Sequence, residues 1–187
     1  MSEQSVGVLL RSLKLPGFLR SHGEVAAQAE REGWGFDRYL LHLAEIEVED
    51  RRGRRIERLL QLSSLPHDKT LCTLDVARMP APVRRSLPTL CEGGFVDRAE
   101  NLLAFGLPGR GKTHLVCAIG RELVQRGYQI LFVPAFKLVQ RLLAAKRDLL
   151  LEAELRRLDR FDAVILDDLG YVQQSREEME VLFTFLA

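Results

Sequence analysis

Apolar positions in the first third of the chain recur every three or four residues, which is the spacing of amphipathic α-helices. The pattern predicts a short helix over residues 5–15 and a second helix over residues 18–33. The Pro16-Gly17 pair separates the two helices, because a proline cannot continue the helix that precedes it. Gly33 is expected to end the second helix.

A third and longer helix is predicted from Asp37 to Leu62. Gly53 lowers the helix propensity by about 1 kcal/mol relative to alanine, so we expect a break or kink there. Together the three helices predict a small all-helical domain over residues 1–64. The buried face of the third helix is expected to contain Leu40, Leu43, Ala44 and Val48.

The pattern then changes from helices alone to apolar runs that alternate with helices. Residues 65–85 contain three prolines and no sustained period, so we expect a linker that wraps over the next domain. Beyond it, apolar runs of strand length occur at 101–105, 129–133 and 163–166. Their alternation with helical segments predicts an α/β domain over 86–187, with a parallel sheet covered by helices on both faces.

Composition adds few constraints. The chain of 187 residues is 47% hydrophobic with a net charge of +1, which is typical of a soluble globular protein and indicates no partner by charge alone. Cys72, Cys91 and Cys117 form no CxxC pair, which argues against a disulfide framework or zinc site and favours a cytoplasmic protein. We see no signal peptide and no segment long enough to span a membrane.

A glycine-rich loop carries the strongest chemical signal. Residues 106–113 fit the pattern G-x-x-x-x-G-K-[ST], in which successive backbone N–H groups point at phosphate oxygens. Lys112 is expected beside the β- and γ-phosphates, and the Thr113 hydroxyl on Mg²⁺. The loop follows one predicted strand and begins a predicted helix, so an accidental glycine-rich turn is the weaker interpretation. The candidate residues for binding ATP are Gly106, Leu107, Pro108, Gly109, Arg110, Gly111, Lys112, Thr113 and His114.

Two side chains in this stretch have alternative interpretations. His114 is expected to be a helix residue beside the site rather than a catalytic group. It also stands where a dinucleotide-binding fingerprint would need its third glycine, which excludes that motif. Arg110 either adds charge near the phosphates or points into solvent.

Two aspartates follow the last predicted strand. Ligands of open parallel sheets bind beyond the carboxyl ends of the strands, where Asp167 and Asp168 are expected. We predict that Asp167 holds Mg²⁺, directly or through water, and that Asp168 is the general base for the attacking water. A solvated acidic turn is the alternative. Lys112, Asp167 and Asp168 are thus the candidate catalytic residues, and Thr113 and Asp167 the candidate metal ligands.

A run of arginines is the candidate surface for DNA or a protein partner. Either it contacts phosphates, or its members pair with Glu47 and Asp50 at i,i+4 spacing, which would account for two of them. A weaker basic set lies at residues 137–147. The run comprises Arg51, Arg52, Arg54, Arg55 and Arg58.

Several segments together resemble the IstB-like ATPases, helper proteins of insertion-sequence transposition that are related to DnaC helicase loaders within the AAA+ class. They read "GLPGRGKTHLVCAIG", "GYQILFV", "LVQRLL" and "VILDDLGY", and "RRIERLLQLSSLPHDKTL" upstream is similar as well. The resemblance implies a P-loop core of AAA+ type that binds ATP and Mg²⁺. It also implies a homo-oligomer on double-stranded DNA that stimulates a partner transposase. A helicase loader, or a nucleotide-binding remnant without turnover, is the alternative.

The resemblance further implies a strand that follows the helix after Asp168. That helix is predicted to begin with a capping box of Ser175 and Glu178, and the sequence ends within it at Ala187. We therefore expect an incomplete core at the C-terminus, and weak or no ATP hydrolysis by these residues alone.

Overall fold

The computed structural model describes residues 3–171 and 175–186. The chain divides into two compact units, Met1–Glu57 and Arg58–Ala187, with the boundary inside a helix. The described residues of the first unit form helices joined by short turns, namely α1 (Glu3–Ser12), α2 (Pro16–Glu32) and most of α3 (Phe36–Ser63).

The three helices predicted from apolar spacing are present, with shifted ends. Pro16 begins α2 instead of only separating it from α1, because proline is favoured at the first helical position, where its missing N–H costs nothing. Gly33 follows α2 with a φ of 64°, the left-handed conformation that glycine adopts readily at helix ends.

Two expectations for α3 were wrong. The helix runs through Gly53 without interruption, and a Cβ added there would meet no atom of the described residues within 4 Å. Leu43 is buried as expected, whereas Leu40 and Val48 are exposed. Glu47 occupies the buried position one turn after Leu43, because its carboxylate has partners from α2.

Glu47 holds the start of α2 against α3. Its Oε2 accepts a 2.6 Å hydrogen bond from the backbone N–H of Gly17, one of the donors that the first turn of a helix leaves unpaired. The approach is close: a Cβ at Gly17 would lie 2.8 Å from Glu47 Oε2 and 3.0 Å from Glu47 Cα. Glycine is therefore required at position 17 by packing.

The second unit contains a parallel sheet, as the alternating pattern predicted. In the described part of the chain, this sheet consists of β1 (Ile130–Pro134) and β2 (Ala163–Asp167), with Ile130 opposite Ala163. The two parallel strands are joined through α7 (Ala135–Arg147) and α8 (Leu151–Leu158).

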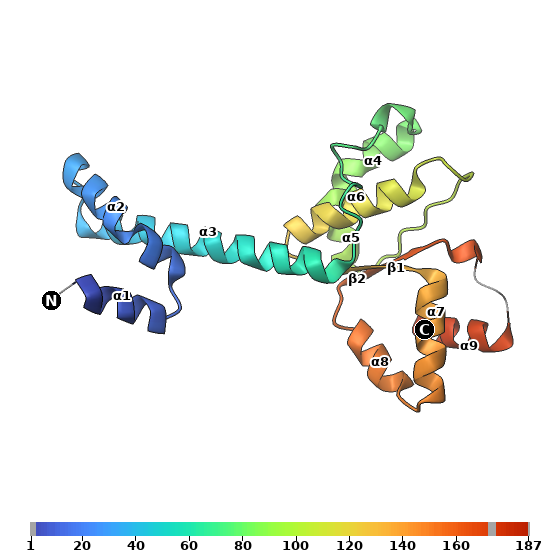
Figure 1. Ribbon diagram of the computed structural model, residues 1–187. Coiled ribbons are helices and arrows are strands. Elements are labelled where there is room, and N and C mark those ends of the chain that lie inside the picture. The colour runs from blue at the N-terminus through green and yellow to red at the C-terminus, as the bar shows by residue number, and fades with distance from the viewer. Residues whose placement is uncertain (1–2, 172–174, 187) are drawn as a thin grey trace. The chain divides into compact units, whose positions relative to one another are not determined.

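Helices cover both faces of the sheet, which confirms the predicted layering (Figure 1). On one face, Gly120 of α6 (Lys112–Gln125) allows the helix to approach Ile165 of β2. On the other face, Leu131 packs in a core with α7, α8 and α9 (Arg176–Leu186). The buried members of that core are Leu131, Leu138, Val139, Leu142, Leu158, Val181 and Leu182.

Residues 101–105 do not form the strand that was predicted for them. Leu103 and Phe105 are 69% and 87% exposed. A strand needs a neighbour to pair its N–H and C=O groups. Among the described residues only β1 pairs with β2, and no ladder reaches 101–105. The apolar run alone therefore gave the wrong secondary structure.

The predicted linker lies against α6. Leu65 is buried near Gly120, and the Arg121 guanidinium donates to the Pro66 carbonyl. The chain then continues through a 3₁₀ turn (Val76–Arg78), α4 (Ala81–Glu92) and α5 (Gly94–Asp97), and another 3₁₀ turn (Leu169–Tyr171) follows β2. None of the described helices has the length and apolarity that crossing a membrane requires.

Candidate functional site: the glycine loop and the end of β2

The glycines of the loop adopt conformations that side chains would disfavour. Gly109 and Gly111 have φ values of 73° and 80°, in the left-handed region that glycine occupies at no steric cost. Among the described residues, a Cβ at either position would meet nothing within 4 Å. These glycines therefore serve the backbone path and leave open space beside it, as close approach of a phosphate requires.

Lys112 begins α6 and folds back over the loop. Its Nζ donates to the carbonyl oxygens of Gly106 and Leu107, at 2.9 and 3.1 Å. The ammonium group is thus held inside the curve of the loop by acceptors that phosphate oxygens could replace. This position fits the role predicted for Lys112 beside the phosphates.

Thr113 connects the loop to β2. Its hydroxyl donates a 2.9 Å hydrogen bond to Asp167 Oδ1. The two predicted magnesium ligands, 54 positions apart in the sequence, therefore meet at the carboxyl end of β2. Among the described residues no group of three His, Cys, Asp or Glu side chains gathers into a metal site. A magnesium ion here would take its remaining ligands from phosphate oxygens and water, as Mg²⁺ commonly does.

Asp168 follows β2 in a left-handed conformation, with a φ of 57°, and is exposed. Backbone in this region is uncommon for a residue other than glycine, although aspartate tolerates it better than most. The conformation turns the chain away from the strand immediately after Asp167. The consecutive carboxylates therefore have different surroundings: Asp167 accepts a hydrogen bond from Thr113 of α6, whereas Asp168 is exposed to solvent.

The remaining loop side chains differ from one another in orientation. Leu107, Pro108 and Arg110 are exposed at the tip of the loop. His114 instead contacts the linker, with its Nε2 3.1 Å from both the Thr70 carbonyl oxygen and Thr73 Oγ1. Neither threonine is indicated by the sequence, because nothing in the spacing of the linker indicates a contact with a residue more than 40 positions away.

A buried thiol lies behind this site. Burial raises the pKa of Cys117 to about 11, and the neighbouring Asp167 carboxylate contributes to the increase. The thiol is therefore protonated at neutral pH and is no nucleophile. Cys117 is buried on α6, about one helical turn after Thr113.

The candidate arginine surface is only partly occupied by internal ion pairs. Arg51 Nε lies 2.8 Å from Glu47, as the i,i+4 interpretation predicted. Arg54 also contacts Glu47, at 3.5 Å, and not the expected Asp50. Asp50 instead pairs with Arg20 of α2 at 2.7 Å.

The other three arginines of the run, at positions 52, 55 and 58, are exposed. Within the described ranges, no ion pair is found for Arg52 or Arg58. Two basic residues of α7 form ion pairs within the protein, since Arg141 pairs with Glu154 and Lys146 with Glu180. The run on α3 therefore remains the better candidate for phosphate contacts.

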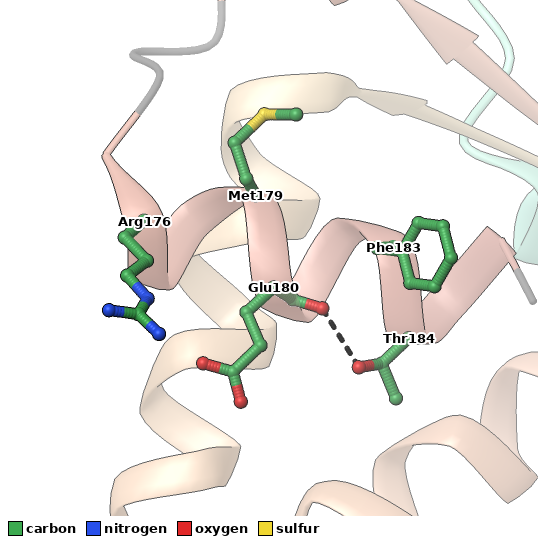
Figure 2. Close-up of a pocket in the computed structure, with 5 residues that line it drawn as sticks. All are labelled: Arg176, Met179, Glu180, Phe183 and Thr184. Atoms are coloured by element: carbon green, nitrogen blue, oxygen red, sulfur yellow. Dashed lines mark hydrogen bonds between the residues drawn. The ribbon is translucent and has the colours of Figure 1, made fainter.

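A hollow of about 510 Å³ lies on α9 (Figure 2). In the described part of the chain, its lining residues all belong to this one helix. The Thr184 hydroxyl donates to the Glu180 carbonyl within the helix, and the Glu180 side chain is paired with Lys146. The hollow therefore lacks polar groups converging from several elements, which the glycine loop has. Its lining residues are Arg176, Met179, Glu180, Phe183 and Thr184.

Comparison with known proteins identifies the family. Residues 8–187 match the family described as IstB-like ATP binding protein. The chain belongs to this family. It is 39% identical over 188 aligned positions to an insertion-sequence ATP-binding protein of Sinorhizobium fredii, an alignment that covers the whole chain and 63% of that relative. This IstB-like chain thus spans less than two thirds of that relative's length.

Two further relatives are also ATP-binding proteins of insertion sequences. The ATP-binding protein of insertion sequence IS5376 from Geobacillus stearothermophilus is 34% identical over 175 residues, covering 94% of the chain and 70% of the relative. The corresponding protein of IS21 from Pseudomonas aeruginosa is 34% identical over 179 residues, covering 96% and 68%. The fold of this chain is accordingly that of a P-loop NTPase domain preceded by helices.

Proposed function

We propose that this IstB-like chain binds ATP with Mg²⁺ at the glycine loop. The observation that carries the proposal is the pairing of Thr113 with Asp167, together with the Lys112 ammonium held within the loop. Lys112 and the backbone N–H groups of residues 109–113 would hold the phosphates, at the positive end of the α6 dipole. Thr113 and Asp167 would hold Mg²⁺, which would neutralise charge on the phosphates.

Asp168 is the proposed general base. It is exposed at the carboxyl end of β2, where a water molecule attacking the γ-phosphate would need a proton acceptor. Among the described residues its carboxylate has no hydrogen bond or ion pair, so a substitution there would act on the fold mainly through the left-handed backbone.

The proposed biological role is that of a helper in DNA transposition. In this role the chain binds double-stranded DNA as an ATP-dependent homo-oligomer and stimulates a partner transposase. The names of the relatives, which are ATP-binding proteins of insertion sequences, support this role over that of a helicase loader. The exposed arginines of α3 support the DNA contact.

A thermal-shift titration tests nucleotide binding. Mg-ATP at a hundredfold excess over its Kd should stabilise the chain by about 2.7 kcal/mol. Lys112→Ala should abolish most of the shift, because it removes the phosphate-facing cation. His67→Ala is the matched control, since His67 is exposed in the linker and should bind as the unaltered chain does. An equal shift for Lys112→Ala, or none for the unaltered chain, contradicts the proposal.

A further inference from the structure

Two side chains of α6 hold the linker along the helix. Arg121 Nη2 donates to the Pro66 carbonyl at 3.1 Å, and His114 Nε2 reaches the Thr70 carbonyl at the same distance. The two side chains are seven residues apart, about two helical turns, and so lie on the same face of α6. The linker is therefore fixed to the helix that begins at the nucleotide loop.

The linker segment that His114 contacts is a compact turn, Asp68–Thr73. The Thr73 hydroxyl donates to the Asp68 carbonyl at 2.6 Å and accepts from the Thr70 backbone N–H at 3.0 Å. The Thr73 backbone N–H in turn donates to Thr70 Oγ1 at 3.2 Å. Side-chain hydroxyls thus close this turn at both ends.

These contacts assign the proton on His114. The Thr70 carbonyl can only accept a hydrogen bond. Nε2 of His114 must therefore carry hydrogen and donate to this carbonyl.

His114 is also next in sequence to the two side chains that a nucleotide would rearrange. Phosphate oxygens would replace the Gly106 and Leu107 carbonyls as acceptors for Lys112. A magnesium ion would compete with the Thr113 hydroxyl for Asp167. The side chains of residues 112–114 all lie on the first turn of α6, so ordering that turn also orders the backbone of His114.

We propose that His114 is a positioning residue that couples occupancy of the nucleotide loop to the linker turn Asp68–Thr73. Mg-ATP orders the first turn of α6, and His114 then holds the turn more firmly. The inference rests on the proposed nucleotide binding and adds a response outside the nucleotide site. The linker follows α3 directly in the sequence. It therefore joins the turn Asp68–Thr73 covalently to the helix that carries the arginine run.

Hydrogen exchange of the full 187-residue chain tests the coupling. The readout is a peptide covering residues 66–76, where the amides of Thr70, Thr73 and Leu74 are hydrogen-bonded. Saturating Mg-ATP should slow exchange there about threefold or more. In His114→Ala, exchange without nucleotide should be about three- to tenfold faster, which is the effect of losing one hydrogen bond.

The variants distinguish coupling to the nucleotide from a contact of His114 that stabilises the turn regardless of nucleotide. Each is measured at a Mg-ATP concentration that saturates that variant, found from its own thermal-shift titration. His114→Ala should lose the response of the 66–76 peptide to Mg-ATP. His114→Gln should restore part of it, since the amide nitrogen of glutamine can donate from nearly the same place. His67→Ala should respond as the unaltered chain does.

Two failures are distinguishable. No thermal shift with Mg-ATP refutes the proposed function and the coupling with it. A normal thermal shift with unchanged exchange over 66–76, or with an equal response in His114→Ala, refutes the coupling alone and leaves nucleotide binding intact.

Discussion

The Glu47 carboxylate lies in the interior of the helical unit and is 4% exposed. Burial by itself would raise its pKa, but hydrogen bonds from the Arg51 side chain and the Gly17 backbone outweigh burial, and the net pKa is below the ordinary value of 4.5. The group is therefore ionised at neutral pH. It joins α2 to α3 through charge-assisted hydrogen bonds, which are stronger than neutral ones.

This lowered pKa makes Glu47 a source of acid sensitivity. Its contribution to stability is present above the unfolded pKa and is lost as the pH falls through the lower folded pKa. We expect Glu47→Gln to cost about 1–3 kcal/mol at pH 7 and much less near pH 3. Urea unfolding followed by circular dichroism at the two pH values measures this difference.

Glu49→Gln is the control for that experiment, because Glu49 is an exposed carboxylate on the same helix. It should change the unfolding free energy by less than about 0.5 kcal/mol at either pH. An equal cost for Glu47→Gln at pH 7 and pH 3 would show that the carboxylate does not act through its charge.

At the residue scale, the sequence is most specific where the chemistry is local. Lys112 and Thr113 follow from a motif of eight positions, and Asp167 follows from the end of an apolar run. The burial of Glu47 was not predicted, because a charged residue among apolar neighbours normally indicates the solvent side of a helix. Its partner Gly17 is 30 positions away, and no periodicity within one helix indicates such a contact.

At the scale of elements, helices were easier to predict than strands. A helix makes its backbone hydrogen bonds within itself, so apolar spacing and end signals sufficed for α2, α6 and α7. A strand depends on a neighbour, and residues 101–105 have the apolar run without one in the described part of the chain. No local property of these five residues distinguishes the two cases.

The contact between α2 and α3 predicts opposite effects for two glycines of α2. Gly17→Ala should destabilise the helical unit by about 1–3 kcal/mol, since its Cβ would meet the backbone of Glu47. Gly23→Ala should stabilise it by about 0.5–1 kcal/mol, because a Cβ there meets nothing within 4 Å in the described ranges and alanine favours helix. Thermal unfolding of both variants provides the comparison, and a stabilising Gly17→Ala would refute the close packing.

The exposed state of residues 101–105 has a measurable consequence. Replacing Leu103 and Phe105 by serine should alter the unfolding free energy of this chain by less than about 0.5 kcal/mol per site, as at other surface positions. Buried strand positions would cost about 2–5 kcal/mol each. The same double variant should scatter less light at high concentration, because fewer apolar side chains face solvent. A loss of several kcal/mol would mean that the segment is buried.

At the scale of the whole molecule, the net charge of +1 conceals a local concentration of positive charge on α3. Arg51 and Arg54 contribute to the fold through Glu47. Arg52 and Arg58 have no such role among the residues described. Charge at these two positions is therefore available for phosphate without disturbing the fold.

Salt dependence distinguishes phosphate contacts from structural arginines. Each phosphate neutralised contributes about 0.9 to the slope of log K against log salt concentration. In the presence of Mg-ATP, the double substitution of Arg52 and Arg58 by alanine should lower that slope by about 1–2. Fluorescence anisotropy with a labelled duplex between 50 and 200 mM salt measures it.

Arg160→Ala is the control, because Arg160 is likewise exposed but lies away from this run in the sequence. It should leave the slope unchanged. If the double variant also keeps the original slope, these two arginines do not belong to the DNA-binding surface.

The hydrogen bonds of Lys112 also bear on the thermodynamics of binding. Fixing a long lysine side chain costs up to about 2 kcal/mol of conformational entropy. Here the loop carbonyls of Gly106 and Leu107 already restrict the ammonium before any ligand arrives. That entropy is lost during folding and not at the moment of association, so the loop is preorganised for an anion. Calorimetry of phosphate ligands should accordingly show a smaller entropic penalty than a flexible lysine would impose.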